Sequence, residues 1–167
     1  MNADITIILI ELAVMCLAFL FLVIGLLLIS PLTFISDYPP EIQEEYCRSQ
    51  NKEASKEKMT VAMKIKKIFG MVAFMFVFAW MLHIAGADSF SQGVLLSYLY
   101  MLVLFFWDTF FLDWVLFANI KRIRLPGTEE MEKEYHQKWF HIKVCLPMIP
   151  VFMVGGILSS LLMIVMW

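Results

Sequence analysis

The stretch KIKKIFGMVAFMFVFAWMLHIAGADSFSQGVLLSYLYMLVLFFWDTFFLDWVLFANIKRIR, residues 64–124, begins and ends with basic residues and is largely apolar between them. Its middle, GADSFSQG at residues 86–93, carries glycines and serines that suit the ends of helices. The flanking segments, residues 68–86 and 94–118, approach or exceed the roughly 20 residues that cross a bilayer core. We therefore expect two antiparallel membrane helices joined by a tight connection.

Two further apolar segments, residues 5–29 and 144–167, have a similar length. The chain is 61% hydrophobic and 17% charged, whereas soluble domains average roughly half apolar and a quarter charged. The first segment lacks the basic n-region and the cleavage site of a signal peptide, so we expect a retained helix. The sequence thus predicts an all-α polytopic membrane protein, a single membrane domain over residues 1–167, built as a four-transmembrane-helix bundle.

The predicted connecting loops, residues 30–67 and 119–143, each contain a segment typical of a short amphipathic surface helix. In SDYPPEIQEEY a proline fits the first helical turn and glutamates follow it. In LPGTEEMEKEY a Pro-Gly turn precedes Thr128, which we expect to cap a helix. Pro147 and Pro150, near the start of the last predicted span, should kink it.

The placement of positive charge predicts the orientation of the chain. All 13 Lys and Arg residues fall within the two long loops, and none lies in the termini or the short connection. By the positive-inside rule, both loops should be cytoplasmic and both termini outside, in a plasma or inner membrane. The cysteines, Cys16, Cys47 and Cys145, show no paired spacing and are predicted to be unbridged.

Four ionisable residues lie inside predicted spans: Glu11, His83, Asp108 and Asp113. Each costs at least about 2.5 to 3.5 kcal/mol at the bilayer centre unless it finds a partner, a water path or a proton. Glu11 and His83 fall at comparable depth below the outer boundary. We therefore expect them to pair, either to join two helices or to serve as a proton site.

Asp108 and Asp113 lie on the third predicted span. On an α-helix they would be about 140° apart, so a paired-carboxylate site is not expected. Asp113 lies near the basic run KRIR and should find a Lys or Arg partner, whereas Asp108 lies deeper and is a candidate proton or ligand site. The polar residues of this span define a sector expected to face the bundle interior: Ser97, Tyr98, Asp108, Thr109, Asp113 and Asn119.

The basic ends of the central hairpin should converge and contact anionic lipid headgroups, unless they serve only as a topogenic signal. The residues concerned are Lys64, Lys66, Lys67, Lys121, Arg122 and Arg124. On the last span, small residues permit close helix packing, either within the bundle or between subunits. These are Gly155, Gly156, Ser159 and Ser160.

No cofactor, metal ion or nucleic acid is predicted, because the sequence contains no nucleotide loop, nucleophile elbow, haem signature or redox cysteine motif. His136 and His141 are five residues apart, unlike the i, i+4 pairs of helical metal sites. A metal site there would need Asp113 or acids from the first loop.

These observations favour a non-enzymatic subunit or binding protein whose polar sector holds a small hydrophobic or cationic ligand, or a partner helix. An alternative is a proton-linked transporter that uses Glu11 and Asp108. A second alternative is an intramembrane enzyme that acts on a lipid or isoprenoid at the cytoplasmic boundary. Asp108 or Asp113 would then be its acid or base, and the converging cations would hold phosphate.

Overall fold

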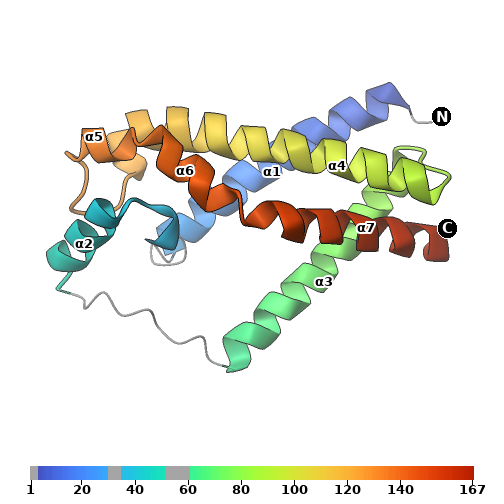
Figure 1. Ribbon diagram of the computed structural model, residues 1–167, viewed down its shortest axis with the longest axis horizontal. Helices are drawn as coiled ribbons and strands as arrows, with labels where there is room; N and C mark the ends of the chain where they lie inside the picture. The colour runs from blue at the N-terminus through green and yellow to red at the C-terminus, as the bar shows by residue number, and fades with distance from the viewer. Residues whose placement is uncertain (1–3, 30–34, 52–60) are drawn as a thin grey trace. The chain divides into compact units, whose positions relative to one another are not determined.

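The computed structural model of the protein describes residues 4–29, 35–51 and 61–167, and it describes the side chains of 61–67 only for Ile65. Every regular element in these ranges is a helix, which confirms the all-α prediction (Figure 1). In chain order they are α1 (Ile5–Ile29), α2 (Pro40–Ser49), α3 (Val61–Ile84), α4 (Phe90–Phe106), η2 (Trp107–Phe117), η3 (Lys121–Ile123), α5 (Glu132–Tyr135), α6 (Lys138–Cys145) and α7 (Met148–Met166).

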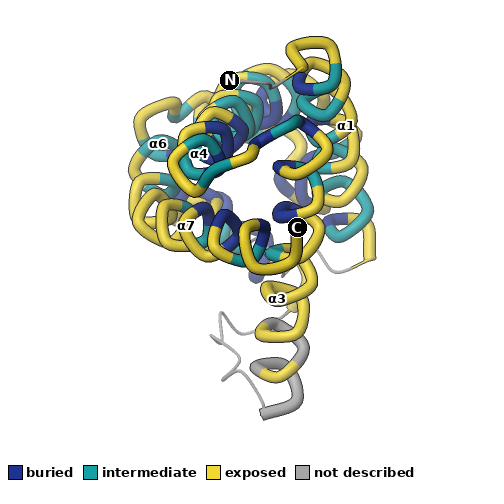
Figure 2. The backbone as a smooth tube through the Cα atoms, turned by 90° about the vertical axis from the view of Figure 1, so that its right-hand side faces the viewer, coloured by how far each residue is buried: buried dark blue, intermediate teal, exposed yellow. Residues whose placement is uncertain are grey.

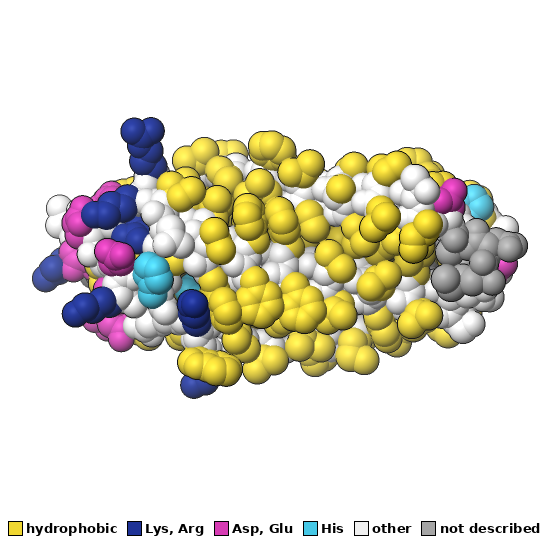
Figure 3. All heavy atoms as spheres, turned by 90° about the horizontal axis from the view of Figure 1, so that it is seen from above, with side chains coloured by type: hydrophobic (Ala, Val, Ile, Leu, Met, Phe, Trp, Pro, Cys, Tyr) yellow, Lys and Arg dark blue, Asp and Glu magenta, His cyan; other side chains and the backbone are white. Residues whose placement is uncertain are grey.

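Three helices of the described residues are long and apolar enough to cross a membrane. They are α1, the continuous helix Phe90–Phe117 formed by α4 and η2, and α7. The apolar part of α3, Ile68–Ile84, is shorter. Large hydrophobic side chains are exposed along these helices and cover much of the surface visible in Figure 3. A surface of this kind is stable against lipid and not against water.

The helix boundaries follow the hydropathy of the sequence, with three differences. The α3 helix begins at Val61, inside the basic stretch that precedes the predicted span. The third predicted span changes from an α-helix to a π-helix at Trp107. The fourth is interrupted between Cys145 and Met148, where Pro147 cannot donate a helical hydrogen bond, at the position where the sequence predicts a kink.

The chain divides into two compact units. Unit 1 comprises Met1–Met15, Glu57–Leu104 and Met148–Trp167, and unit 2 comprises Cys16–Lys56 and Phe105–Pro147. In unit 1, α3 packs against α7. Figure 2 shows that residues 68–74 of α3 are exposed, whereas buried positions recur along α4 and α7. The core of this unit contains Phe78, Leu82, Leu96, Tyr100 and Met163.

The small residues of α7 permit a close approach to α4 within unit 1. A Cβ atom added to Gly156 would lie 2.9 Å from Oγ of Ser97, whereas one added to Gly155 would meet nothing within 4 Å. Ser159 and Ser160 are also fully buried. Three of the four residues predicted to allow close packing are therefore enclosed by the chain itself.

Unit 2 is organised around buried tyrosines from its two loop segments. The Tyr135 hydroxyl accepts a hydrogen bond from the Leu125 amide at 3.0 Å and donates to the Thr128 hydroxyl at 2.7 Å. Thr128 in turn donates to the Leu125 carbonyl at 2.7 Å. Tyr38 contacts the edge of the Tyr135 ring, with the ring centroids 5.9 Å apart. These contacts fix the segment around the Pro-Gly turn against the core.

The surface helices predicted in the loops are present with different roles. The α2 helix starts with Pro40 in its first turn, as expected, but buries Ile42 and Tyr46 in the core of unit 2. The prediction that Thr128 caps a helix is wrong, because its hydroxyl is engaged by Leu125 and Tyr135. The α5 helix begins only at Glu132 and is a single turn.

Candidate functional site

The π-helix η2 brings together the two acids that the sequence places apart. A π-helix is held by hydrogen bonds between residues five apart, so such residues lie on roughly the same side of the helix. Asp108 and Asp113 are separated by this interval. At the end of η2 the Ala118 amide still bonds to the carbonyl of Asp113, five residues earlier, and the Ile120 amide then returns to Leu116, four residues earlier. The expectation that the two carboxylates lie on different faces is therefore wrong.

The α6 helix packs against η2 and adds two side chains to these acids. Ligand atoms of Asp108, Asp113 and Cys145 all lie within 4.8 Å of one another. His141, one turn before Cys145, has its Nδ1 atom 3.3 Å from Oδ2 of Asp113. We call Asp108, Asp113, His141 and Cys145 the η2–α6 cluster. All four belong to unit 2.

The partner of Asp113 differs from the one predicted. The sequence suggests a Lys or Arg from the nearby basic run, but the contact is made by the imidazole of His141. His141 is only 4% exposed, so its position is fixed by burial on α6. Among the ion pairs of the described residues, neither Asp108 nor Asp113 is joined to a Lys or Arg. The cluster is thus rich in carboxylate with little compensating positive charge.

The cluster is partly buried, since Asp108, Asp113 and Cys145 are half-buried and His141 is buried. Thr109 is fully buried and faces the thiol of Cys145. Asp37, just before α2, lies within electrostatic range of Asp108, Asp113 and His141.

Several buried nitrogen atoms around the cluster have no hydrogen-bond partner within the described ranges. They include Nε2 of His141 and the indole Nε1 atoms of Trp107 and Trp114. Buried polar atoms in native proteins are nearly always paired. Of these three nitrogen atoms, Nε2 of His141 belongs to the cluster itself.

The predicted pair of Glu11 and His83 does not form. The Tyr100 hydroxyl donates a hydrogen bond to Oε2 of Glu11 at 2.5 Å. His83 instead stacks on Trp167, with ring centroids 4.8 Å apart and planes inclined by 13°. The neutral phenol therefore supplies the hydrogen bond that the half-buried carboxyl group of Glu11 needs.

The polar sector predicted on the third span is divided. Ser97 belongs to unit 1, donates to the Val94 carbonyl at 3.0 Å and packs beside Gly156. Asp108, Thr109 and Asp113 belong to unit 2. Asn119 is exposed and donates its amide to the carbonyls of Val115 and Trp114, so it satisfies the end of the helix and not the cluster.

The predicted lipid-binding cations have different environments. The side chains of Lys64, Lys66 and Lys67 lie outside the described part of the chain. Lys121 pairs with Glu130 at 2.6 Å, and this hydrogen bond holds the pKa of Glu130 below its ordinary value. Arg122 is exposed.

Arg124, in contrast, is only 6% exposed. Its guanidinium donates to the carbonyls of Phe117, Ala118 and Glu129 and lies 4.7 Å from the ring centroid of Tyr135. The side chain that we expected at a lipid headgroup is therefore enclosed by its own loop.

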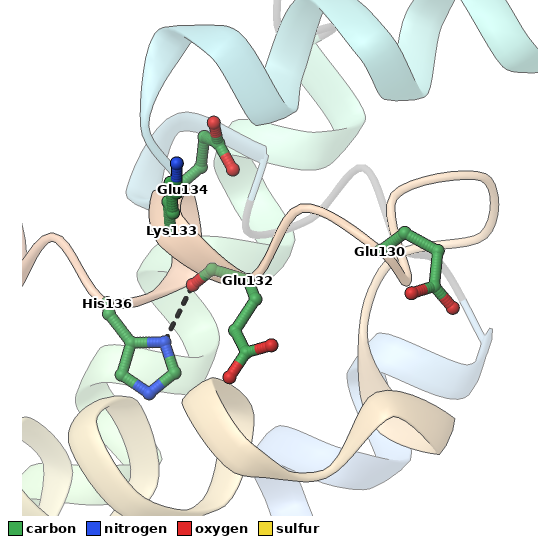
Figure 4. Close-up of a pocket in the computed structure, with 5 residues that line it drawn as sticks. All are labelled: Glu130, Glu132, Lys133, Glu134 and His136. Atoms are coloured by element: carbon green, nitrogen blue, oxygen red, sulfur yellow. Dashed lines mark hydrogen bonds between the residues drawn. The ribbon is translucent and has the colours of Figure 1, made fainter.

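Hollows also lie outside the cluster among the described residues. In unit 1 a cavity of about 820 Å³ is lined by apolar side chains of α3, α4 and α7, including Met71, Phe74, Met101 and Phe152. In unit 2 a charged hollow of about 630 Å³ lies beside α5 (Figure 4). There Nδ1 of His136 donates to the Glu132 carbonyl at 2.6 Å, whereas Glu134 and Lys133 point away from the ring. The charged side chains of this hollow do not converge.

Sequence reasoning did not select Cys145, and it considered His141 only together with His136. A signal for both was present, because His141 and Cys145 are four residues apart and so share one face of a helix. The sequence indicates that a metal site with these histidines would need Asp113 or acids from the first loop, and His141 does lie beside Asp113. No family model, curated protein or solved structure compared with this chain matches it.

Proposed function

We propose that this chain is an integral membrane binding protein whose η2–α6 cluster holds a small cationic ligand. The observation that carries the proposal is the convergence of Asp108 and Asp113 with Cys145 and His141, without a paired Lys or Arg among the described residues. Two carboxylates in an enclosed site attract cations strongly, because solvent screens their charge poorly there. The ligand would supply the positive charge that the protein itself does not.

The proposal includes four membrane crossings. The fourth would be formed by α3, whose 24 residues span about 36 Å as an α-helix although only part of it is strongly apolar. The confinement of all Lys and Arg to two segments supports cytoplasmic loops and external termini, in a plasma or inner membrane. An exposed cation such as Arg122 would then meet anionic headgroups, with a contribution of about 1 kcal/mol per well-placed charge.

The first test measures binding of a small organic cation, tetramethylammonium, to the purified full chain in lipid nanodiscs. Calorimetric titration should give saturable binding to the wild type, and Asp108→Asn or Asp113→Asn should weaken it at least tenfold. These substitutions remove charge while keeping the size of the side chain. Asp88→Asn, at an exposed position outside the cluster, is the matched control and should leave affinity unchanged.

A second readout is the stability of the protein with and without the cation. A ligand that binds only the folded state stabilises it by about 2.7 kcal/mol at one hundred times its dissociation constant. This gain should be lost in Asp108→Asn and kept in Asp88→Asn. The proposed function is refuted if neither tetramethylammonium nor the divalent ions considered below bind the wild type in a manner that depends on Asp108.

A further inference from the structure

We propose that the η2–α6 cluster is a site for a divalent transition-metal ion of the zinc class, bound by Asp108, Asp113 and Cys145 and supported by His141. This inference rests on the proposed function and names its cation. The three ligand residues come from two packed helices, and their donor atoms already lie within 4.8 Å of one another. Around a tetrahedral zinc ion, ligand atoms are roughly 3.5 Å apart, so small side-chain rotations would close the site.

The combination of donors selects the type of metal. Carboxylates alone suit Mg²⁺ and Ca²⁺, which prefer oxygen ligands. A thiolate beside carboxylates instead favours Zn²⁺ and the neighbouring ions of the first transition row, such as Co²⁺. Cys145 is therefore the residue that distinguishes this site from a binding site for an alkaline-earth ion or an organic cation.

His141 adds a histidine to the acids and the thiol. Its side chain is 5% exposed, its Nδ1 atom lies 3.3 Å from Oδ2 of Asp113, and its Nε2 atom has no hydrogen-bond partner in the described ranges. An imidazole that contacts a ligating carboxylate limits the orientations open to that ligand, and such supporting partners are common around protein-bound metals. We assign His141 as a positioning residue for Asp113.

The charge of the site leads to the same conclusion. Two carboxylates lie beside a thiol, and the one ion-pair partner of these groups among the described residues is the imidazole. Enclosed charges persist in proteins when they are paired or when they coordinate a metal. A divalent ion would compensate both carboxylates at once.

The test uses cobalt as a spectroscopic probe on the full chain in nanodiscs after treatment with a chelator. Wild-type protein should bind one Co²⁺ per chain and develop the near-ultraviolet charge-transfer absorption of a cobalt–thiolate bond. Cys145→Ser should lose this absorption, whereas Cys47→Ser, which removes a buried thiol outside the cluster, should keep it. Asp108→Asn should weaken binding at least tenfold.

His141→Gln separates a positioning role from a general loss of structure. Loss of such a supporting residue typically lowers metal affinity about 10- to 100-fold. The energy of the charge-transfer absorption should nevertheless remain that of the wild type once the site is saturated, because the thiolate is still a ligand. An unchanged affinity would refute the role of His141.

A measurement on the wild-type protein keeps the metal site testable even if a variant does not fold. Zn²⁺ should slow alkylation of Cys145, measured by mass spectrometry, relative to Cys16 and Cys47 in the same sample. No protection together with no cobalt absorption refutes the metal site. If tetramethylammonium then still binds in a manner that depends on Asp108, the metal inference fails and the proposed function stands. If no cation binds, both fail.

Discussion

At the scale of single residues, Arg124 shows how a basic side chain can serve the fold of a loop. Arg124→Lys would replace the planar fork that reaches three carbonyls and stacks on Tyr135 with a single ammonium group. We expect the free energy of unfolding in detergent to fall by about 2 kcal/mol or more, since hydrogen bonds from charged groups contribute about 1.5 to 3 kcal/mol each. Arg122→Lys, at an exposed position, should change it by less than about 0.5 kcal/mol. Equal effects would contradict this account.

The bond between Tyr100 and Glu11 gives a second prediction at this scale. Tyr100→Phe keeps the ring that packs on Phe78 and removes the donor to the carboxyl group. Side-chain hydrogen bonds in membrane proteins average about 0.6 kcal/mol and reach about 1.7 kcal/mol, and we expect a loss in this range. The free energy of unfolding of purified protein measures it. Tyr98→Phe, on the same helix and partly exposed, should have a smaller effect, and the reverse order would refute the prediction.

Residue identities predicted which groups need partners, but not which partners they find. Glu11 is expected to need a partner in a membrane, yet the phenol of Tyr100 and not the imidazole of His83 contacts it. Helical depth limits the possible partners, while the rotation of each helix about its axis chooses among them. That rotation depends on packing between helices, which a single sequence does not specify.

At the scale of elements, hydropathy predicted the long helices well because a bilayer imposes a length on apolar segments. The α1 helix has the predicted bounds, and the predicted kink coincides with the break before α7. The closeness of the Asp108 and Asp113 carboxylates could not be predicted, because the apolar pattern of this span indicates an α-helix whereas η2 is a π-helix. Amino-acid composition does not indicate where an α-helix changes to a π-helix. Such π-helical turns often occur at functional sites.

The contact between α4 and α7 yields an element-scale prediction with a neighbouring control. Gly156→Ala would place a methyl group 2.9 Å from Oγ of Ser97 and 3.2 Å from the Tyr98 ring. Overpacking of this kind costs about 1 to 3 kcal/mol, and we expect the free energy of unfolding to fall by that amount. Gly155→Ala meets open space and should stabilise the helix by up to about 1 kcal/mol. If both variants lose the same stability, the close approach of the helices is not the cause.

At the scale of the whole molecule, the distribution of apolar and basic residues determines how the chain can lie in a membrane. Three described helices meet the length and hydropathy of a span, and the fourth depends on α3. The number of crossings has a simple consequence, because an even number places both termini on one side and an odd number places them on opposite sides. The position of the termini therefore tests α3 directly.

We expect reporter fusions to the amino end, to the carboxyl end and after Asp88 all to lie outside, since the positive-inside rule keeps the Lys- and Arg-containing loops in the cytoplasm. Alkaline phosphatase, active outside, and green fluorescent protein, fluorescent inside, give complementary readouts at each position. A fusion after Lys121 is the internal control and should give the cytoplasmic signal. Termini on opposite sides would mean that α3 does not cross, because without it the chain passes through the bilayer three times. In that case, with the Lys121 fusion still cytoplasmic, the amino end would lie inside while Asp88 and the carboxyl end lie outside, a pattern that the four-crossing arrangement cannot produce.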